Sequence, residues 1–159
     1  MLSQLKSIRE DLMRCIMEFT EEQFNQKPAE DRWSAAQVAH HLYTTEKQIV
    51  GSLRESLELE SEKAEERDFS FIVDRTRKVK SETEPPAQFL EKQDVCALLL
   101  ESRENLEQLV KKEGEEAFIN KSIEDEAFGR MSLKNLVDFI GFHEKRHTAQ
   151  IDEIKSEII

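Results

Sequence analysis

Apolar residues recur at intervals of three and four along four long segments of the chain, and this spacing restricts the fold more than any other feature. Such spacing places apolar side chains on one face of an α-helix, whereas a half-buried strand needs strict alternation. No segment shows a competing strand pattern, and no internal repeat is evident. We therefore expect helices over about residues 2–19, 34–59, 95–113 and 132–158. In the same order, their inward stripes are Leu5, Ile8, Leu12, Ile16 and Phe19; Val38, Leu42, Thr45, Ile49 and Leu53; Val95, Leu98, Leu99, Ser102, Leu106, Leu109 and Val110; and Leu133, Leu136, Val137, Ile140, Ile151, Ile154 and Ile158.

Short polar residues mark where helices begin. Ser34 is followed three residues later by Gln37, which is the pattern of a capping box, and Ser132 is the expected cap of the last helix. Thr20 and Gln23 repeat the box and predict a short helical turn after the first long helix.

The length and the few turn residues favour a single helical domain. The chain has 159 residues with only 4 Gly and 3 Pro, so we expect one domain over residues 1–159. The predicted fold is all-α: a four-helix bundle of antiparallel helices with a long crossover between helices 2 and 3. Residues 69–92 would form the irregular part of that crossover, which at this length is often functional or covers a site. Its basic run, residues 75–80, could contact a partner, but we favour the interpretation as solvated chain.

Charge and composition exclude several partners. The net charge of -11 argues against nucleic acid and against anionic membranes. No window approaches the 18 apolar residues of a membrane span, and the first residues do not resemble a signal peptide. Cys15 and Cys96 do not make a disulfide framework, so we interpret them as buried small hydrophobic residues in a reducing cytoplasm.

The four histidines fall in two clusters, and helical geometry separates them by direction. His143 and His147 are four residues apart and share a face with the apolar stripe of the last helix. On the second helix, His41 lies near the inward stripe, whereas His40 lies on the far side and is assigned to solvent or an interface. Imidazole pairs one turn apart commonly bind divalent transition metals, so His41, His143 and His147 are the candidate metal ligands.

Other interpretations of these residues have to be weighed. Each inward histidine could be a hydrogen-bonded core residue without a metal. Residues 143–147 match the H-E-x-x-H motif of zinc proteases, but the third histidine of the extended motif is replaced by Glu153, and no sheet is expected to align a peptide. A di-iron bundle needs two Glu-x-x-His pairs, and only Glu144 with His147 provides one.

Further motifs at both ends of the chain accompany these histidines. The first half contains FTEEQFNQKP over residues 19–28, then Trp33-Ser34 and His41-Leu42. The last part contains Phe128-Gly129, Ser132-Leu133 and HEKRHTAQI over residues 143–151. In this combination and order the chain resembles the DinB-like, YfiT-like proteins, while residues 54–120 match them only in general layout.

The resemblance implies a four-helix bundle with a metal held by His41, His143 and His147. Members of the family bind a divalent metal such as nickel, zinc or iron, with water in the open positions, and homodimers are common. Some are thiol-dependent transferases that use bacillithiol or mycothiol, some are thiol-dependent isomerases, and others have no known activity. The resemblance also implies a structural role for Trp33 and hydrogen bonds from Asn135 or Gln150 near the site.

Two functional hypotheses follow. In the first, the chain is a metal-dependent enzyme, either a thiol-dependent S-transferase or a hydrolase, that acts on a small electrophilic substrate with a low-molecular-weight thiol. Glu144, near the inward face, is then a candidate base or a hydrogen-bond partner of the metal ligands, and the alternative is an exposed carboxylate beside Lys145. In the second, the chain is a non-catalytic, metal-stabilised stress-related bundle or a dimeric interaction protein. Three histidines with no evident fourth ligand favour the enzyme, because catalytic sites keep a coordination position open.

Overall fold

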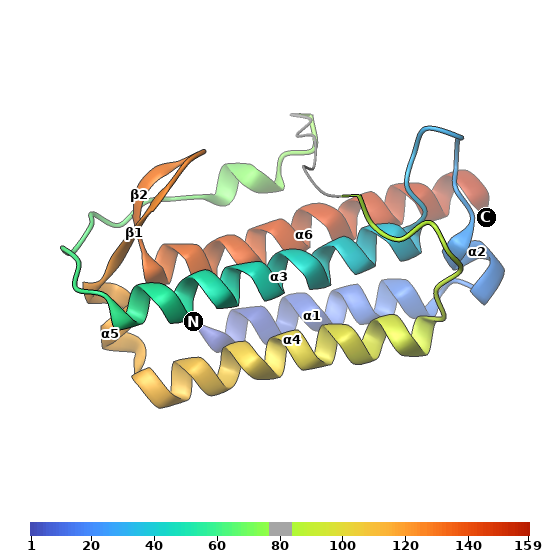
Figure 1. The fold of residues 1–159 in the computed structure, drawn as a ribbon. Coiled ribbons are helices and arrows are strands. Elements are labelled where there is room, and N and C mark those ends of the chain that lie inside the picture. Colours follow the sequence, from blue (N-terminus) through green and yellow to red (C-terminus); the bar gives the residue numbers. More distant parts are fainter. Residues whose placement is uncertain (77–83) are drawn as a thin grey trace.

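The computed structural model describes residues 1–76 and 84–159 and confirms the predicted four-helix bundle with a long crossover (Figure 1). The long helices are α1 (Leu2–Met17), α3 (Ala35–Glu58), α4 (Lys92–Glu113) and α6 (Leu133–Ile158). Shorter elements connect them: α2 (Glu21–Asn25), the 3-10 helix η1 (Ser70–Val73), α5 (Glu115–Asn120) and the strands β1 (Ser122–Asp125) and β2 (Gly129–Ser132).

The long helices form two parallel pairs. Figure 1 shows α1 and α6 running in one direction and α3 and α4 in the other. Lys92, which begins α4, donates from Nζ to the Phe19 carbonyl just beyond the end of α1 (2.6 Å). Arg32, just before α3, pairs with Glu157 at the end of α6. The expectation that all four helices alternate in direction is therefore wrong, because the crossover returns the chain to the end of the bundle where α3 begins.

The predicted capping boxes are confirmed and set the start of α3. The Gln37 backbone N–H donates to Ser34 Oγ (3.1 Å), and the Ser34 backbone N–H donates to Gln37 Oε1 (2.9 Å). Thr20 and Gln23 make the same reciprocal pair at the start of α2. The cap at Ser34, seven residues before His41, therefore defines where α3 begins.

A small hairpin is present where no strand was expected. Strands β1 and β2 pair antiparallel over residues 122–125 and 129–132, and the carboxylate of Asp125 accepts from the backbone N–H groups of Ala127 and Phe128 in the turn. Gly129 has a φ of +75°, which favours glycine. Four-residue strands are too short for alternation to stand out from the surrounding sequence.

The crossover between α3 and α4 is fastened to both helices that carry the histidines. On the α6 side, Arg146 donates to the backbone carbonyls of Ile72 (3.1 Å) and Asp74. On the α3 side, Gln37 donates to the Pro86 carbonyl (3.4 Å). The basic run expected over residues 75–80 lies mostly outside the described residues, which include only Arg75 and Thr76 of it.

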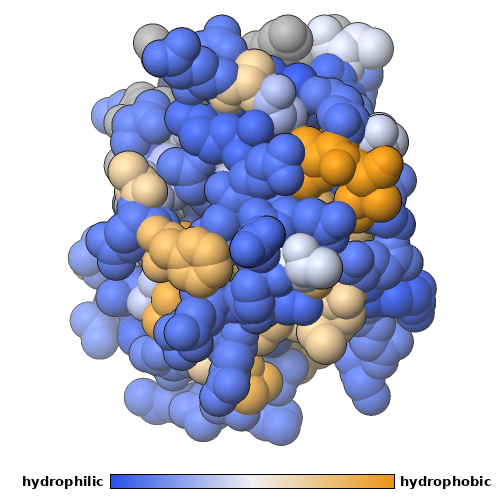
Figure 2. All heavy atoms as spheres, turned by 90° about the vertical axis from the view of Figure 1, so that its right-hand side faces the viewer, coloured by the Kyte–Doolittle hydropathy of each residue, from blue (hydrophilic) through white to orange (hydrophobic). Residues whose placement is uncertain are grey.

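The surface agrees with the acidic, polar composition. Figure 2 faces the end of the bundle where the C-terminus lies, and it shows hydrophilic residues with small separate apolar patches. No helix within residues 1–76 and 84–159 is long and apolar enough to cross a membrane.

The apolar core is divided into two clusters along the bundle. One cluster includes Leu5, Val50, Leu106 and Ile140, and the other includes Leu12, Leu42, Leu99 and Ile151. Each long helix carries a buried or nearly buried charged residue that falls between members of the two clusters and pairs with such residues of the other helices: Arg9 on α1, Glu46 on α3, Arg103 on α4 and Glu144 on α6.

These four residues form one ion-pair layer. Arg103 donates to Glu46 (2.7 Å) and to Glu144 (3.0 Å). Arg9 donates to the same two carboxylates, at 2.8 Å to Glu144 and 3.2 Å to Glu46. The Ser102 hydroxyl adds a hydrogen bond to Glu46 (2.6 Å), and further guanidinium donors bond to backbone carbonyls of α1 and α4. Two positive and two negative charges balance, which a buried charged cluster requires.

Removing one member of this layer should destabilise the bundle strongly. For Arg103→Met we expect the free energy of unfolding to fall by about 3–5 kcal/mol, because buried carboxylates lose their partner. Urea denaturation followed by circular dichroism measures the loss. The control is Arg14→Met, which removes an exposed pair with Asp11 and should cost less than about 1 kcal/mol. Similar losses in both variants would contradict a structural role for the layer.

Candidate metal centre

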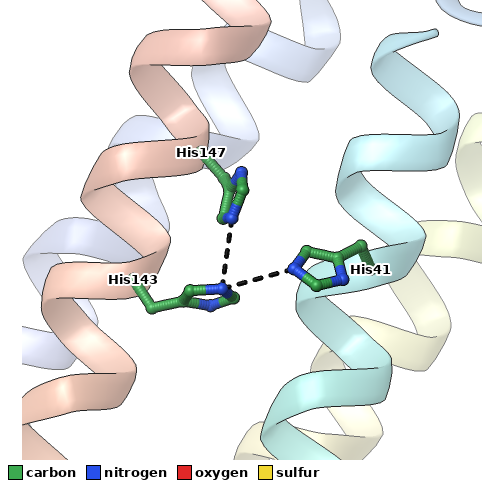
Figure 3. A group of neighbouring side chains, drawn as sticks. All are labelled: His41, His143 and His147. Atoms are coloured by element: carbon green, nitrogen blue, oxygen red, sulfur yellow. Dashed lines mark hydrogen bonds between the residues drawn. The ribbon is translucent and has the colours of Figure 1, made fainter. Parts of the chain in front are cut away.

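Three histidines from two helices bring their ring nitrogens together, as predicted (Figure 3). His41 projects from α3, and His143 and His147 project one turn apart from α6. His143 Nε2 lies 3.3 Å from His41 Nε2 and 3.1 Å from His147 Nε2. All three candidate ligand atoms lie within 4.8 Å of one another.

These spacings suit a common metal ion. Imidazole nitrogens bind Zn²⁺ at about 2.0–2.1 Å, so two of them on one ion lie roughly 2.9–3.4 Å apart at octahedral to tetrahedral angles. The two measured Nε2 separations, 3.1 and 3.3 Å, fall in that range.

Burial keeps the three rings neutral. Desolvation is the main cause in each case: it lowers the pKa of His41, takes the pKa of His143 well below its usual range, and lowers the pKa of His147 to about 3. The positive charge of Arg146 lowers the pKa values of His143 and His147 further. At neutral pH each ring therefore retains an unprotonated nitrogen, which metal binding requires.

Gln150 selects the ring nitrogen that His147 presents. Gln150 Oε1 lies 2.7 Å from His147 Nδ1, so a proton on Nδ1 completes this hydrogen bond and leaves Nε2 with a lone pair. With His147 in this form and all rings neutral, a hydrogen on His143 or His41 can satisfy only one of the two short Nε2 contacts at a time. A cation between the three nitrogens satisfies all of them, so the donor set fits a metal.

Aromatic rings cover two of the three imidazoles. Trp33 lies 5.3 Å from His41 between ring centroids, and its Nε1 donates to Glu84 (3.2 Å). Phe139 stacks on His143 with centroids 5.5 Å apart and an interplanar angle of 17°. Phe139 was missed in the sequence, although its position four residues before His143 places both on one helix face.

The structure places the Glu144 carboxylate in the ion-pair layer, and the expectation that it is exposed is wrong. Glu144 is buried, with a relative exposure of 2%, so it is not an exposed carboxylate beside Lys145. It accepts hydrogen bonds from Arg9 and Arg103 in the ion-pair layer. Adjacent helix positions differ by about 100°, so Glu144 is directed to α1 and α4 while His143 is directed to α3. The H-E-x-x-H motif therefore lacks its catalytic carboxylate.

Two other residues are placed away from the trio. His40 contacts the Tyr43 ring and Thr44, as its outward position predicted. Asn135 bonds to the backbone of Arg67 and so holds the crossover, which leaves Gln150 as the amide at the histidines.

Comparison with known proteins identifies the family. The DinB superfamily matches residues 4–151. The chain belongs to the DinB superfamily. This DinB superfamily protein is 31% identical to YuaE of Bacillus subtilis (strain 168) over 142 residues, which covers 87% of each chain.

Two solved structures share the DinB superfamily chain's fold. TT2238, a four-helix bundle protein, superposes with a TM-score of 0.68 at 18% identity and covers 96% of this chain and 95% of its own. YfiT from Bacillus subtilis was described as a probable metal-dependent hydrolase with an unusual four-helix bundle topology. It superposes with a TM-score of 0.69 at 19% identity, covering 97% of this chain and 83% of its own.

Trp33 is the single tryptophan of this DinB superfamily chain and should report metal binding directly. We expect Ni²⁺ to quench its fluorescence with one-to-one saturation, because an open-shell ion on His41 would lie next to the indole. His143→Ala should abolish the saturable quenching. His40→Ala, a control on α3 whose ring points away from the three histidines, should retain it. Equal quenching in the two variants would contradict the ligand assignment.

Gln150 should tune the affinity of the centre. Gln150→Ala removes the partner of His147 Nδ1 and is expected to weaken metal binding about 10–100-fold, as loss of a ligand's outer hydrogen bond generally does. Competition with a chromogenic chelator measures the change. Gln108→Ala, at an exposed position of α4, is the matched control, and an unchanged affinity in Gln150→Ala would refute the role.

Proposed function

We propose that this DinB superfamily protein is a metal-dependent enzyme that acts on a small electrophilic substrate, as a thiol-dependent S-transferase or as a hydrolase. The observation that carries the proposal is the convergence of three neutral imidazole nitrogens that leave room on a bound ion. Within residues 1–76 and 84–159, no fourth His, Cys, Asp or Glu joins this group. Structural zinc sites are usually closed by four protein ligands, whereas catalytic sites keep a position open.

The identity of the ligands restricts the metal. Imidazole nitrogen suits zinc, nickel, iron and copper better than it suits magnesium or calcium, which prefer oxygen. A divalent ion held by neutral ligands keeps its full charge and supplies Lewis acidity that lowers the pKa of a bound water or thiol. The protein's part is to hold His147 in one tautomer through Gln150 and to shield His41 and His143 from water with aromatic rings.

The chain's own cysteines are poor candidates for the nucleophile. Burial raises the pKa of the Cys15 thiol and of the Cys96 thiol, so both are protonated at neutral pH. A thiol nucleophile would therefore come from a low-molecular-weight co-substrate, whose sulfur bonds to the electrophilic carbon as the leaving group departs and the thiol proton goes to solvent. Water takes the same place in a hydrolase, the activity ascribed to the structurally similar YfiT.

The decisive assay compares the two nucleophiles. Zinc- or nickel-loaded protein is incubated with monobromobimane and bacillithiol or cysteine, and separately with p-nitrophenyl acetate without thiol. We expect turnover in one arm at a rate at least about 100-fold above that of His143→Ala. The variant lacks a metal ligand, and a bound ion that activates the nucleophile and stabilises developing negative charge typically contributes a rate effect of this size. His40→Ala should retain the rate.

The assay also separates the enzyme from a non-catalytic bundle. If chelation lowers the melting temperature but neither arm shows turnover that depends on His143, the metal serves stability and the enzymatic proposal fails. Turnover that persists in His143→Ala would likewise contradict the assigned centre.

A further inference from the structure

Arg75 has a hydrogen-bond donor that meets no acceptor. It follows η1, and its terminal nitrogen NH2 donates to Glu153 on α6 (3.0 Å). Its Nε is buried and has no hydrogen-bond partner. In the described parts of the chain, every other buried side-chain nitrogen or oxygen atom has one. An unsatisfied buried donor is costly, and native proteins rarely retain one without a function or a bound ligand.

Two sets of hydrogen bonds hold Arg75 at this place. Arg146 lies on α6 between the two histidines of that helix and donates to the carbonyls of Ile72 and Asp74, the residues that lead into Arg75. The Glu153 contact fixes the guanidinium on the same helix. Arg75 is therefore held through the backbone before it and through its terminal nitrogen, and these contacts leave its Nε–H unpaired.

The surroundings favour an anion. Arg146 lies between His143 and His147 on α6 and bonds to the backbone that leads into Arg75, and Arg75 bonds to Glu153 on the same helix, so both guanidinium groups lie along the turns of α6 from His143 to Glu153. Burial is the main cause of the lowered pKa values of His143 and His147; the charge of Arg146 lowers both further, and the charge of Arg75 lowers that of His147. Burial and the charge of Arg75 lower the pKa of Arg146, while Asp74 and Glu153 oppose this effect. A divalent ion on three neutral ligands would add positive charge to the same region.

We propose that Arg75 binds an oxyanion, a carboxylate or phosphate, of the small molecule that reaches the metal centre, and that its Nε–H is the donor reserved for it. Arginine suits this task because its guanidinium stays charged and presents several donors in a fixed plane. The proposal rests on the proposed function, since the molecule would be the substrate or its thiol co-substrate. It places substrate recognition on the crossover and the metal ligands on the helices.

Two thiols that differ only in charge test the proposal without turnover. The zinc-loaded full chain is titrated calorimetrically with 3-mercaptopropionate and with 3-mercapto-1-propanol. We expect the acid to bind at least about tenfold more tightly, which is the size of a hydrogen bond between charged groups. Arg75→Gln should remove this preference, leave the affinity for the alcohol unchanged, and leave the zinc content unchanged.

Arg32→Gln is the matched control. Arg32 also pairs with a glutamate of α6, Glu157, so the variant removes an equal charge near the same helix without touching Arg75. It should retain the preference for the acid. Competition by acetate and by inorganic phosphate then shows which oxyanion Arg75 prefers.

The outcomes are distinguishable. No preference in the wild type, or equal losses in Arg75→Gln and Arg32→Gln, would overturn the role of Arg75. A preference that depends on Arg75 without any turnover would sustain the anion site and remove the enzymatic proposal. Failure of both thiols to bind the zinc-loaded protein would overturn the anion site and the role of a thiol co-substrate, while the zinc content of the same sample still tests the metal centre separately.

Discussion

The rest of the structure depends on a buried layer of two arginines and two glutamates, one from each long helix. Two apolar clusters of similar character lie on either side of this layer, and apolar packing alone would tolerate sliding of the helices past one another. Charged groups do not tolerate it, because a shift would leave a buried carboxylate or guanidinium without its partner. We infer that the layer specifies helix register, which matters in a bundle whose α3 and α4 are parallel and are not joined by a tight turn.

The layer also orients the candidate metal centre. Glu144 is held by Arg9 and Arg103 on the α1 and α4 side of α6, and His143 is the preceding residue. About 100° of rotation per residue then directs His143 to α3, where His41 lies five residues before Glu46. The same ionic contacts that fasten the helices thus determine which faces of α3 and α6 meet. The histidines gain a desolvated position in which they are neutral, and a bound cation would satisfy nitrogens that hydrogen bonds among the rings cannot.

Helix periodicity was sufficient to predict the four helices, the outward position of His40 and the inward directions of His41, His143 and His147, because each of these follows from direction on a single helix. The packing of α3 against α6, which brings the three rings together, was implied by the resemblance to the family and is not contained in the spacing within either helix. Helix periodicity was not sufficient to predict that Glu144 is buried in an ion-pair layer, because its partners Arg9 and Arg103 lie on other helices. A signal was present: Arg9 lies between Leu5 and Leu12 and therefore falls within an apolar stripe, where a charged residue needs a buried partner. The parallel directions of α3 and α4 and the short hairpin depend on tertiary pairing, which apolar spacing within one segment does not contain.

The parallel directions of α3 and α4 in turn explain why the crossover is long. A helix of 24 residues such as α3 is about 36 Å long, and an extended chain needs roughly 11 residues to return along it. Residues 59–91 provide far more chain than this return requires. The surplus allows the chain to pass along α6, where Arg146 fastens it, and to reach the start of α3, where Glu84 meets Trp33. A direct return would bring neither Arg75 to Glu153 nor Glu84 to Trp33, which packs against His41. The length of the crossover is thus a consequence of topology, and it brings charged groups both to α6 and to the start of α3.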